Sequence, residues 1–250
     1  MADTVSGLFD LDPGVCIARV TLAGPELTAA TSQRLVDACE QAAGNDTVRA
    51  LVVTGAAPGT FLVGMTLVSE AERSLVTRAV AALATLPKPT IAVLTGPAHG
   101  IGLELALACD LRLAAEEATF ALPLTHATGL PFCGGTQRLP RVIGRARALD
   151  MVLTGRVVDA REALSWGLVV RTAPGAALAE VATTLVREVL AGAPLALALA
   201  KEALLAAQDL PLAEGLRLEE DLYALLQTSA DRAEGVRAFL AGRAPVFTGR

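Results

Sequence analysis

The chain has few aromatic residues, few lysines and no long uninterrupted apolar run. Phe, Trp and Tyr make up only 3% of its 250 residues, and Lys88 and Lys201 are its only lysines. The net charge is −5 and no long basic run occurs, so nucleic-acid binding is not expected. No stretch of about twenty apolar residues is free of charge, Gly or Pro, so no membrane span is expected either.

Cysteines are also sparse, and none forms a CxxC pair. Four cysteines are scattered along the chain, so neither a metal site nor a disulfide framework is indicated. The first ten residues, MADTVSGLFD, are acidic and lack the basic and then apolar pattern of a signal peptide. These features predict a cytoplasmic protein. The apolar content, 53%, is attributed to a large core and subunit interfaces.

The most informative stretch runs from Pro87 to Ala115. Thr90 to Thr95 is an apolar, β-branched run bounded by turn residues, which predicts a buried strand. Small residues follow at Gly100 and Gly102, and Leu103 to Cys109 predicts a short buried helix. A strand, a glycine turn and a helix start can hold a negative oxygen, because the first helical N–H groups have no partner inside the helix.

The rest of the chain alternates strands and helices before it becomes helical. Predicted strands cover 8–11, 15–22, 49–54, 111–115, 118–121 and 168–171, and predicted helices cover about 31–43, 66–84, 145–153 and 159–166. From 176 to 240 the pattern is helical, with breaks at 192–194 and 209–211. This last quarter is too apolar to stand alone.

Several motifs together resemble one known family, the crotonase (enoyl-CoA hydratase/isomerase) superfamily. The stretch from Pro87 resembles its PKPxIAAVxGxAxGGGxELALxCDxRxA segment. Gly134 to Ala148 resembles GGTQRLPRxxGxxRA, and Leu153 to Val169 resembles LTGxxxxAxEAxxxGLV. The resemblance runs from about Val15 to the C-terminus.

The resemblance implies a fold, a substrate class and an assembly. The expected fold is an α/β, crotonase-like spiral of ββα units over residues 1–190, with a C-terminal helical trimerisation region over 191–250. The implied substrate is an acyl-CoA or an acyl-carrier thioester, without a further cofactor or a metal. A homotrimer or a dimer of trimers is the implied assembly.

In this family two backbone N–H groups stabilise a thioester enolate. By position these donors map to Met65, directly after Gly64, and to Ile101, between Gly100 and Gly102. Glu104 matches the first of the two glutamates that act in hydratases, where it orients or deprotonates water. Without the resemblance, Glu104 reads equally well as a first-turn residue that favours the helix dipole.

The chain departs from the family at the second glutamate. Leu124 stands in its place, and a leucine cannot move a proton. His126, two residues on, is a hypothetical replacement proton donor, although a solvated loop histidine is the plainer interpretation. Phe132 and Cys133 replace small residues of the acyl pocket. For His99, just before the turn, a packed or backbone-bonded histidine is favoured over one that faces the acyl group.

The CoA-binding features are reduced as well. The segment 22–28 lacks the basic residue that the family uses there, whereas the C-terminal tail retains the family pattern with Phe239 and Arg243. The leading prediction is therefore an enoyl-CoA hydratase-like lyase with one glutamate. The alternatives are a decarboxylase of a branched or malonyl-type thioester and a non-catalytic acyl-thioester binding protein.

Overall fold

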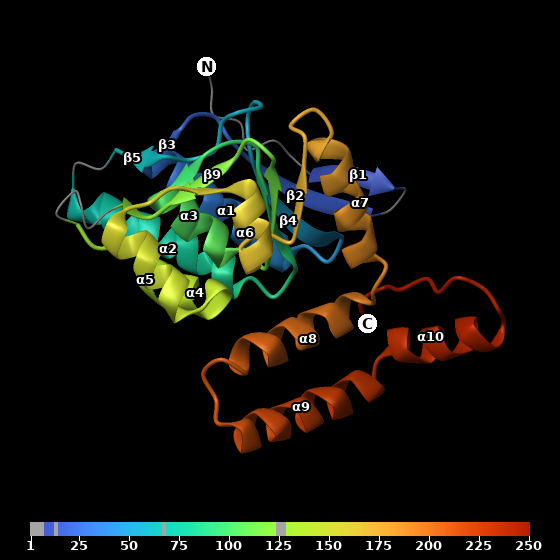
Figure 1. Ribbon diagram of the computed structural model, residues 1–250. Coiled ribbons are helices and arrows are strands. Elements are labelled where there is room, and N and C mark those ends of the chain that lie inside the picture. Colours follow the sequence, from blue (N-terminus) through green and yellow to red (C-terminus); the bar gives the residue numbers. More distant parts are fainter. Residues whose placement is uncertain (1–7, 13–14, 67–68, 124–128) are drawn as a thin grey trace.

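The computed structural model describes residues 8–12, 15–66, 69–123 and 129–250 (Figure 1). A six-stranded sheet lies at its centre. Its strands run in the order β1 (Leu8–Asp12), β2 (Val15–Leu22), β4 (Val48–Gly55), β6 (Thr90–Leu94), β8 (Leu111–Ala115) and β11 (Arg171–Ala173). Within this six-stranded sheet only β1 and β2 pair antiparallel, and the other neighbouring strands pair parallel.

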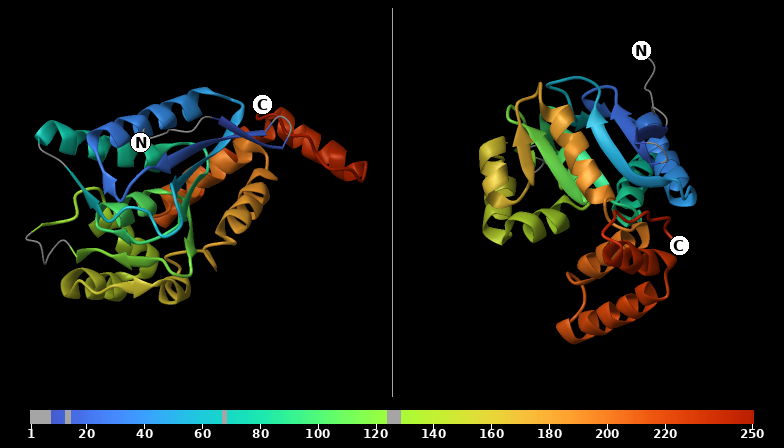
Figure 2. Two further views of the ribbon diagram at one scale, coloured as in Figure 1. Left: turned by 90° about the horizontal axis from the view of Figure 1, so that it is seen from above. Right: turned by 90° about the vertical axis from the view of Figure 1, so that its right-hand side faces the viewer.

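Helices cover both faces of this sheet, which explains why its central strands β4 and β6 are largely buried. The crossover helices are α1 (Ala29–Gly44), α2 (Glu70–Thr85) and α3 (Ile101–Ala108). Because β2, β4, β6 and β8 follow one another in one direction, right-handed crossovers place these helices on one face. On the other face, α7 (Leu178–Leu190) contacts β4, β6 and β8 (Figure 2).

Two smaller sheets bring loops together beside the start of α3. One consists of β3 (Glu26–Leu27) and β5 (Gly64–Met65), and the other of β10 (Val158–Asp159), β9 (Thr119–Ala121) and β7 (Ala98–His99). Three short helices complete the core: α4 (Gly135–Ile143), α5 (Arg145–Thr154) and α6 (Ala160–Trp166).

The last three helices, α8 (Pro194–Ala206), α9 (Leu212–Gln227) and α10 (Ala230–Leu240), lie apart from this core (Figures 1 and 2). Neither α8 nor α9 has a buried residue. Their exposed large side chains include Leu204, Leu212, Leu216 and Tyr223. This leaves an extended apolar surface on one chain.

One carboxylate ties α8 to the core. Asp110, between α3 and β8, accepts from the Thr90 N–H at 2.8 Å and lies 2.7 Å from the Lys201 ammonium of α8. The Lys201 ammonium also donates to the Lys88 carbonyl. Because both charged side chains are largely buried, this pair is screened less than a surface pair.

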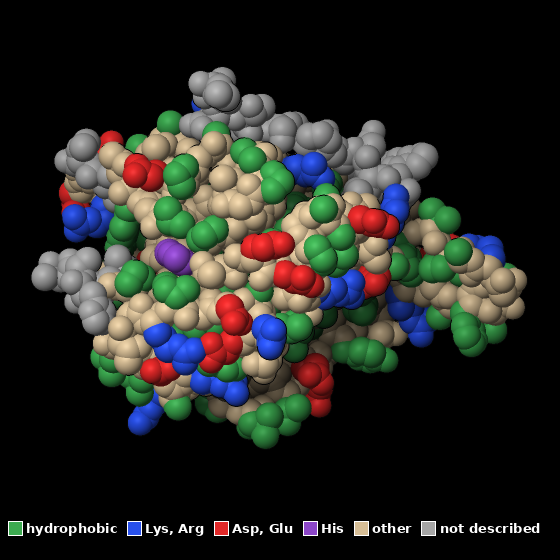
Figure 3. Space-filling view, turned by 45° about the horizontal axis from the view of Figure 1, so that its top comes forward, with side chains coloured by type: hydrophobic (Ala, Val, Ile, Leu, Met, Phe, Trp, Pro, Cys, Tyr) green, Lys and Arg blue, Asp and Glu red, His purple; other side chains and the backbone are tan. Residues whose placement is uncertain are grey.

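Surface charge and helix hydropathy bear on the expectations for nucleic-acid and membrane binding. On the face in Figure 3, Lys and Arg side chains lie interspersed with Asp and Glu. Within the described ranges, no single helix has both the length and the hydropathy to cross a bilayer. The pair α7 and α8 passes that test only when both helices are taken together, and it is bent by 97°.

The predicted elements are present, with shifted boundaries. The first helix is capped by Thr28, whose side chain accepts from the Thr31 N–H, so it begins at Ala29 and not at the predicted residue 31. The strand predicted at 168–171 lies at β11 instead. Gly167 ends α6 with a left-handed backbone, and the Leu168 N–H still bonds to the Ala163 carbonyl as part of that helix end.

We expect Asp110→Asn to lower the free energy of unfolding by about 3–5 kcal/mol, because it leaves Lys201 buried without its counterion. Urea unfolding measures this change. Asp209→Asn is the matched control, since Asp209 pairs with Arg141 at the exposed surface, and it should cost less than about 1 kcal/mol. Equal losses in the two variants would contradict a structural role for the Lys201–Asp110 pair.

Candidate active site

The start of α3 presents free backbone donors. Gly100 precedes the helix and has no side chain with which to cap it, and the first bond of the helical turn runs from the Glu104 N–H to the Gly100 carbonyl at 3.1 Å. The N–H groups of Ile101 and its two successors therefore have no acceptor within the helix. The helix dipole adds partial positive charge at the same place.

A second donor comes from β5. The N–H groups of Gly64 and Thr66 bond to carbonyls of the β3 segment, at Pro25 and Leu27 respectively. In a parallel ladder successive N–H groups point to opposite sides of the strand, so the N–H of Met65 points away from β3. Because α3 contacts β5, the predicted donors Met65 and Ile101 belong to neighbouring segments.

A close backbone contact fixes these two segments. The Leu62 carbonyl, just before β5, accepts from the His99 N–H at 2.9 Å. A Cβ atom at Gly102 would lie 2.0 Å from the same Leu62 carbonyl oxygen. Only glycine lets the first turn of α3 approach the Leu62 backbone this closely.

Glu104 is the buried charge of the site. Its side chain is fully buried in the first turn of α3, among apolar neighbours. Its Oε1 accepts from the N–H groups of Cys133 and Gly135, both at 2.8 Å. Its Oε2 is also buried and has no hydrogen-bond partner among the described residues. One oxygen is thus fixed, and the other keeps its full capacity for a proton or a bound water.

The pKa of Glu104 is raised, and burial is the main cause. The backbone N–H groups of the 132–135 segment oppose this shift, as does the positive charge of Arg138. A carboxyl with a raised pKa exchanges a proton more readily near neutral pH than an exposed one does.

Cys133 lies beside this carboxyl. Burial, followed by the nearby Glu104 charge, raises the pKa of its thiol to about 12, so the thiol is neutral. Its Sγ is 3.9 Å from the Thr77 hydroxyl of α2, and the Arg73 guanidinium lies 6.0 Å from the centre of the Phe132 ring. Sequence patterns did not indicate Thr77 or Arg73, because neither belongs to a recognisable motif.

The structure places the other predicted residues in different surroundings. His99 precedes the turn, bonds through Nε2 to the Thr119 hydroxyl at 3.0 Å, and has a pKa lowered by burial. It is therefore a half-buried neutral histidine whose ring bonds to a side-chain hydroxyl and not, as one of the predictions had it, to the backbone. Leu124 and His126 lie outside the described residues.

Phe239 and Arg243 are not near Glu104 in the single chain. Phe239 lies in α10 and Arg243 follows that helix, which lies apart from α3 (Figure 1). The Phe239 ring is 85% exposed, and the Arg243 guanidinium pairs with Glu234 at 2.6 Å. Any contact of this tail with a thioester must therefore involve another chain or another arrangement of the tail.

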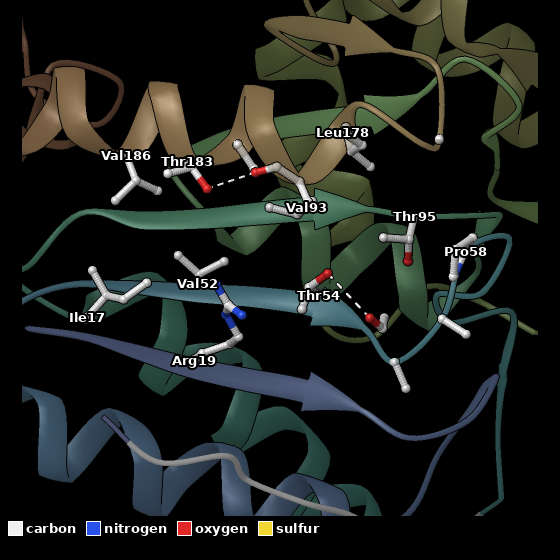
Figure 4. Close-up of a pocket in the computed structure, with 16 residues that line it drawn as sticks. Ile17, Arg19, Val52, Thr54, Pro58, Val93, Thr95, Leu178, Thr183 and Val186 are labelled. Carbon is white, nitrogen blue, oxygen red and sulfur yellow. Dashed lines mark hydrogen bonds between the residues drawn. The ribbon is translucent and has the colours of Figure 1, made fainter. Parts of the chain in front are cut away.

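Two cavities lie elsewhere. A cavity of about 270 Å³ between α7 and the sheet is lined by apolar side chains with Arg19, Thr54 and Thr183, and none of its lining residues belongs to the site (Figure 4). A cavity of about 570 Å³ separates α4 from the end of α8, with Arg138 in its wall. In the part of the chain that the structure describes, no three His, Cys, Asp or Glu side chains cluster as a metal site requires.

Known proteins with similar sequences show the family to which this chain belongs. A family model described as enoyl-CoA hydratase/isomerase matches residues 14–250. The chain belongs to the crotonase superfamily. The 2,3-dehydroadipyl-CoA hydratase of Escherichia coli (strain K12) is 39% identical over 231 residues, which cover 90% of each chain. The 1,2-epoxyphenylacetyl-CoA isomerase of the same organism is 37% identical over 234 residues, or 87% of each chain.

A solved crotonase-superfamily structure confirms the fold. The enoyl-CoA hydratase from Bacillus anthracis superposes with a TM-score of 0.93 at 33% identity, covering 99% of this chain and 100% of that one. The predicted α/β crotonase fold with C-terminal helices is therefore correct. The chain is an enoyl-CoA hydratase/isomerase-type enzyme, and its family implies acyl-CoA substrates.

We expect Gly102→Ala to destabilise the protein by about 1–3 kcal/mol, because its Cβ would have to displace the Leu62 backbone. Thermal or urea unfolding measures the loss. Gly24→Ala serves as the control, since a Cβ there meets nothing within 4 Å. If the two variants unfold alike, the contact between α3 and the segment before β5 is not tight.

Proposed function

We propose that this crotonase adds water to a 2-enoyl thioester, with Glu104 as its single acid/base and the N–H groups of Met65 and Ile101 as enolate donors. The observation that carries the proposal is the state of the Glu104 carboxyl. One oxygen is held by two backbone N–H groups, and the other is buried without a described partner.

One carboxyl suffices to balance the reaction R–CH=CH–CO–SR′ + H2O → R–CH(OH)–CH2–CO–SR′. The water oxygen bonds to C3 while Oε2 of Glu104 takes one of its protons. The π electrons move to the thioester oxygen, and the Met65 and Ile101 N–H groups stabilise the resulting enolate. Glu104 then returns the proton to C2, so that no net proton is gained or lost.

The choice of reaction rests on this chain's own residues. The two Escherichia coli relatives have nearly the same sequence identity to this chain, 37% and 39%, yet one is named an isomerase and the other a hydratase. Leu124 has no proton to exchange, so a mechanism with two glutamates is not available at that position. A mechanism in which one carboxyl takes and returns the same proton fits the residues that remain.

Assembly is part of the proposal. The exposed apolar side chains of α8 and α9 support a homotrimer or a dimer of trimers, in which these helices contact another copy. In such an assembly Phe239 and Arg243 can reach the thioester carrier of a neighbour. The group that carries the thioester is coenzyme A or the pantetheine arm of a carrier protein. The pantetheine arm needs fewer basic contacts than coenzyme A does.

We expect Glu104→Gln to lower kcat for hydration of crotonyl-CoA by about 10²–10⁴-fold, because an amide cannot exchange the proton. Loss of the enoyl-thioester absorbance measures the rate. Met65→Ala is the matched control, since it keeps the backbone donor and should retain most of the activity. If wild-type protein binds the thioester but never turns it over, the protein is a binder or acts on a different thioester.

The same mechanism predicts the pH dependence. Glu104 must be ionised in the free enzyme to take the proton from water. Because burial raises its pKa above the ordinary 4.5, kcat/KM should fall as the pH drops through this raised pKa and stay level above it. A pH–rate profile that remains flat to pH values below 4.5 would contradict Glu104 as the base.

A further inference from the structure

Arg138 touches the segment that holds the Glu104 carboxyl. This half-buried residue lies in the first turn of α4, and its Nη1 donates to the Cys133 carbonyl at 2.8 Å. Its own N–H bonds to the Gly134 carbonyl at 2.8 Å. The guanidinium therefore folds back over the turn from which its helix begins.

The turn is shaped to receive this guanidinium. Gly134 has a φ of 97°, which strongly favours glycine. A Cβ atom at this position would lie 2.3 Å from Nη1 and 3.0 Å from Cζ of Arg138. The missing side chain of Gly134 thus provides the space in which the guanidinium rests against the backbone.

The contact of Arg138 lies between the two donors to Glu104. Along the chain, the Cys133 carbonyl comes after the Cys133 N–H and before the Gly135 N–H. Both N–H groups bond to Oε1 of Glu104 at 2.8 Å. A displacement of the 133–135 turn would move both donors away from the carboxyl at once.

Arg138 also brings the positive charge that acts on this carboxyl. Its charge lowers the pKa of Glu104 against the effect of burial. Among the described groups nearby, Cys133 is a neutral thiol, Thr77 does not titrate and His99 bonds to Thr119, whereas the Arg73 guanidinium lies over the Phe132 ring.

We propose that Arg138 is a positioning residue for Glu104: it clamps the 133–135 turn whose two N–H groups orient the carboxyl, and it brings a positive charge close to that carboxyl. The inference rests on the proposed role of Glu104 and adds the group that controls it. The residue does not touch the reacting atoms.

The variant Arg138→Gln tests the proposed positioning role. Arg141→Gln is the matched control, because Arg141 lies one turn further along α4 and pairs with exposed Asp209. For Arg138→Gln we expect kcat to fall about 10–100-fold, KM to change little, and the acid limb of the pH–rate profile to move to higher pH. Arg141→Gln should match the wild type in all three. Arg138→Lys, which keeps the charge but not the planar guanidinium, should restore the acid limb more than kcat.

A second readout does not depend on turnover. In protein with ¹³C-labelled glutamate, the Glu104 carboxyl signal is assigned by its loss in Glu104→Gln. Its titration midpoint should rise in Arg138→Gln and stay in place in Arg141→Gln. An unchanged midpoint in folded Arg138→Gln would overturn the proposal. If Arg138→Gln does not fold, Arg138→Lys takes its place, and a kcat equal to that of the wild type in Arg138→Lys would overturn the proposal. Absent turnover in the wild type overturns the hydratase function alone, because this titration is still measurable.

Discussion

The pair of backbone hydrogen bonds to Oε1 of Glu104 is the constraint on which the site depends. A fully buried carboxyl is costly unless it is paired, and here the 133–135 turn supplies the pairing for one oxygen only. The cost that remains raises the pKa of the group and leaves Oε2 ready for a proton. The 133–135 turn, Arg138 and helix α3, which carries Glu104, therefore form one unit. Helix α3 is distant in sequence from the other two parts.

A second constraint positions the proposed enolate donors, Met65 and Ile101. The Leu62 backbone lies against Gly102, and the β3–β5 pairing turns the Met65 N–H away from its neighbouring strand. Both donors are main-chain groups, so the side chains at 65 and 101 are free to vary without loss of the N–H. A Met and an Ile can therefore serve at these two positions.

Local patterns predicted a strand at 90–95, observed at 90–94, together with the turn and the α3 helix, because each is marked by composition and glycine within a few residues. They did not predict β3 and β5, since two-residue strands have no periodicity to detect. The interaction of Arg138 with the Cys133 turn was also missed, although the GGTQRL motif was recognised. A side chain that folds back on a backbone carbonyl leaves no mark in the sequence beyond the glycine that makes room for it.

The most direct test of the site is a crystal structure of Glu104→Gln with a bound 2-enoyl-CoA. The thioester oxygen should lie about 2.7–3.1 Å from the backbone nitrogens of both Met65 and Ile101. The side-chain amide at 104 should face C2 and C3 on one side of the double bond. A thioester oxygen that contacts neither nitrogen, or an acyl chain bound away from residue 104, would contradict the assignment of the enolate donors and of the single acid/base.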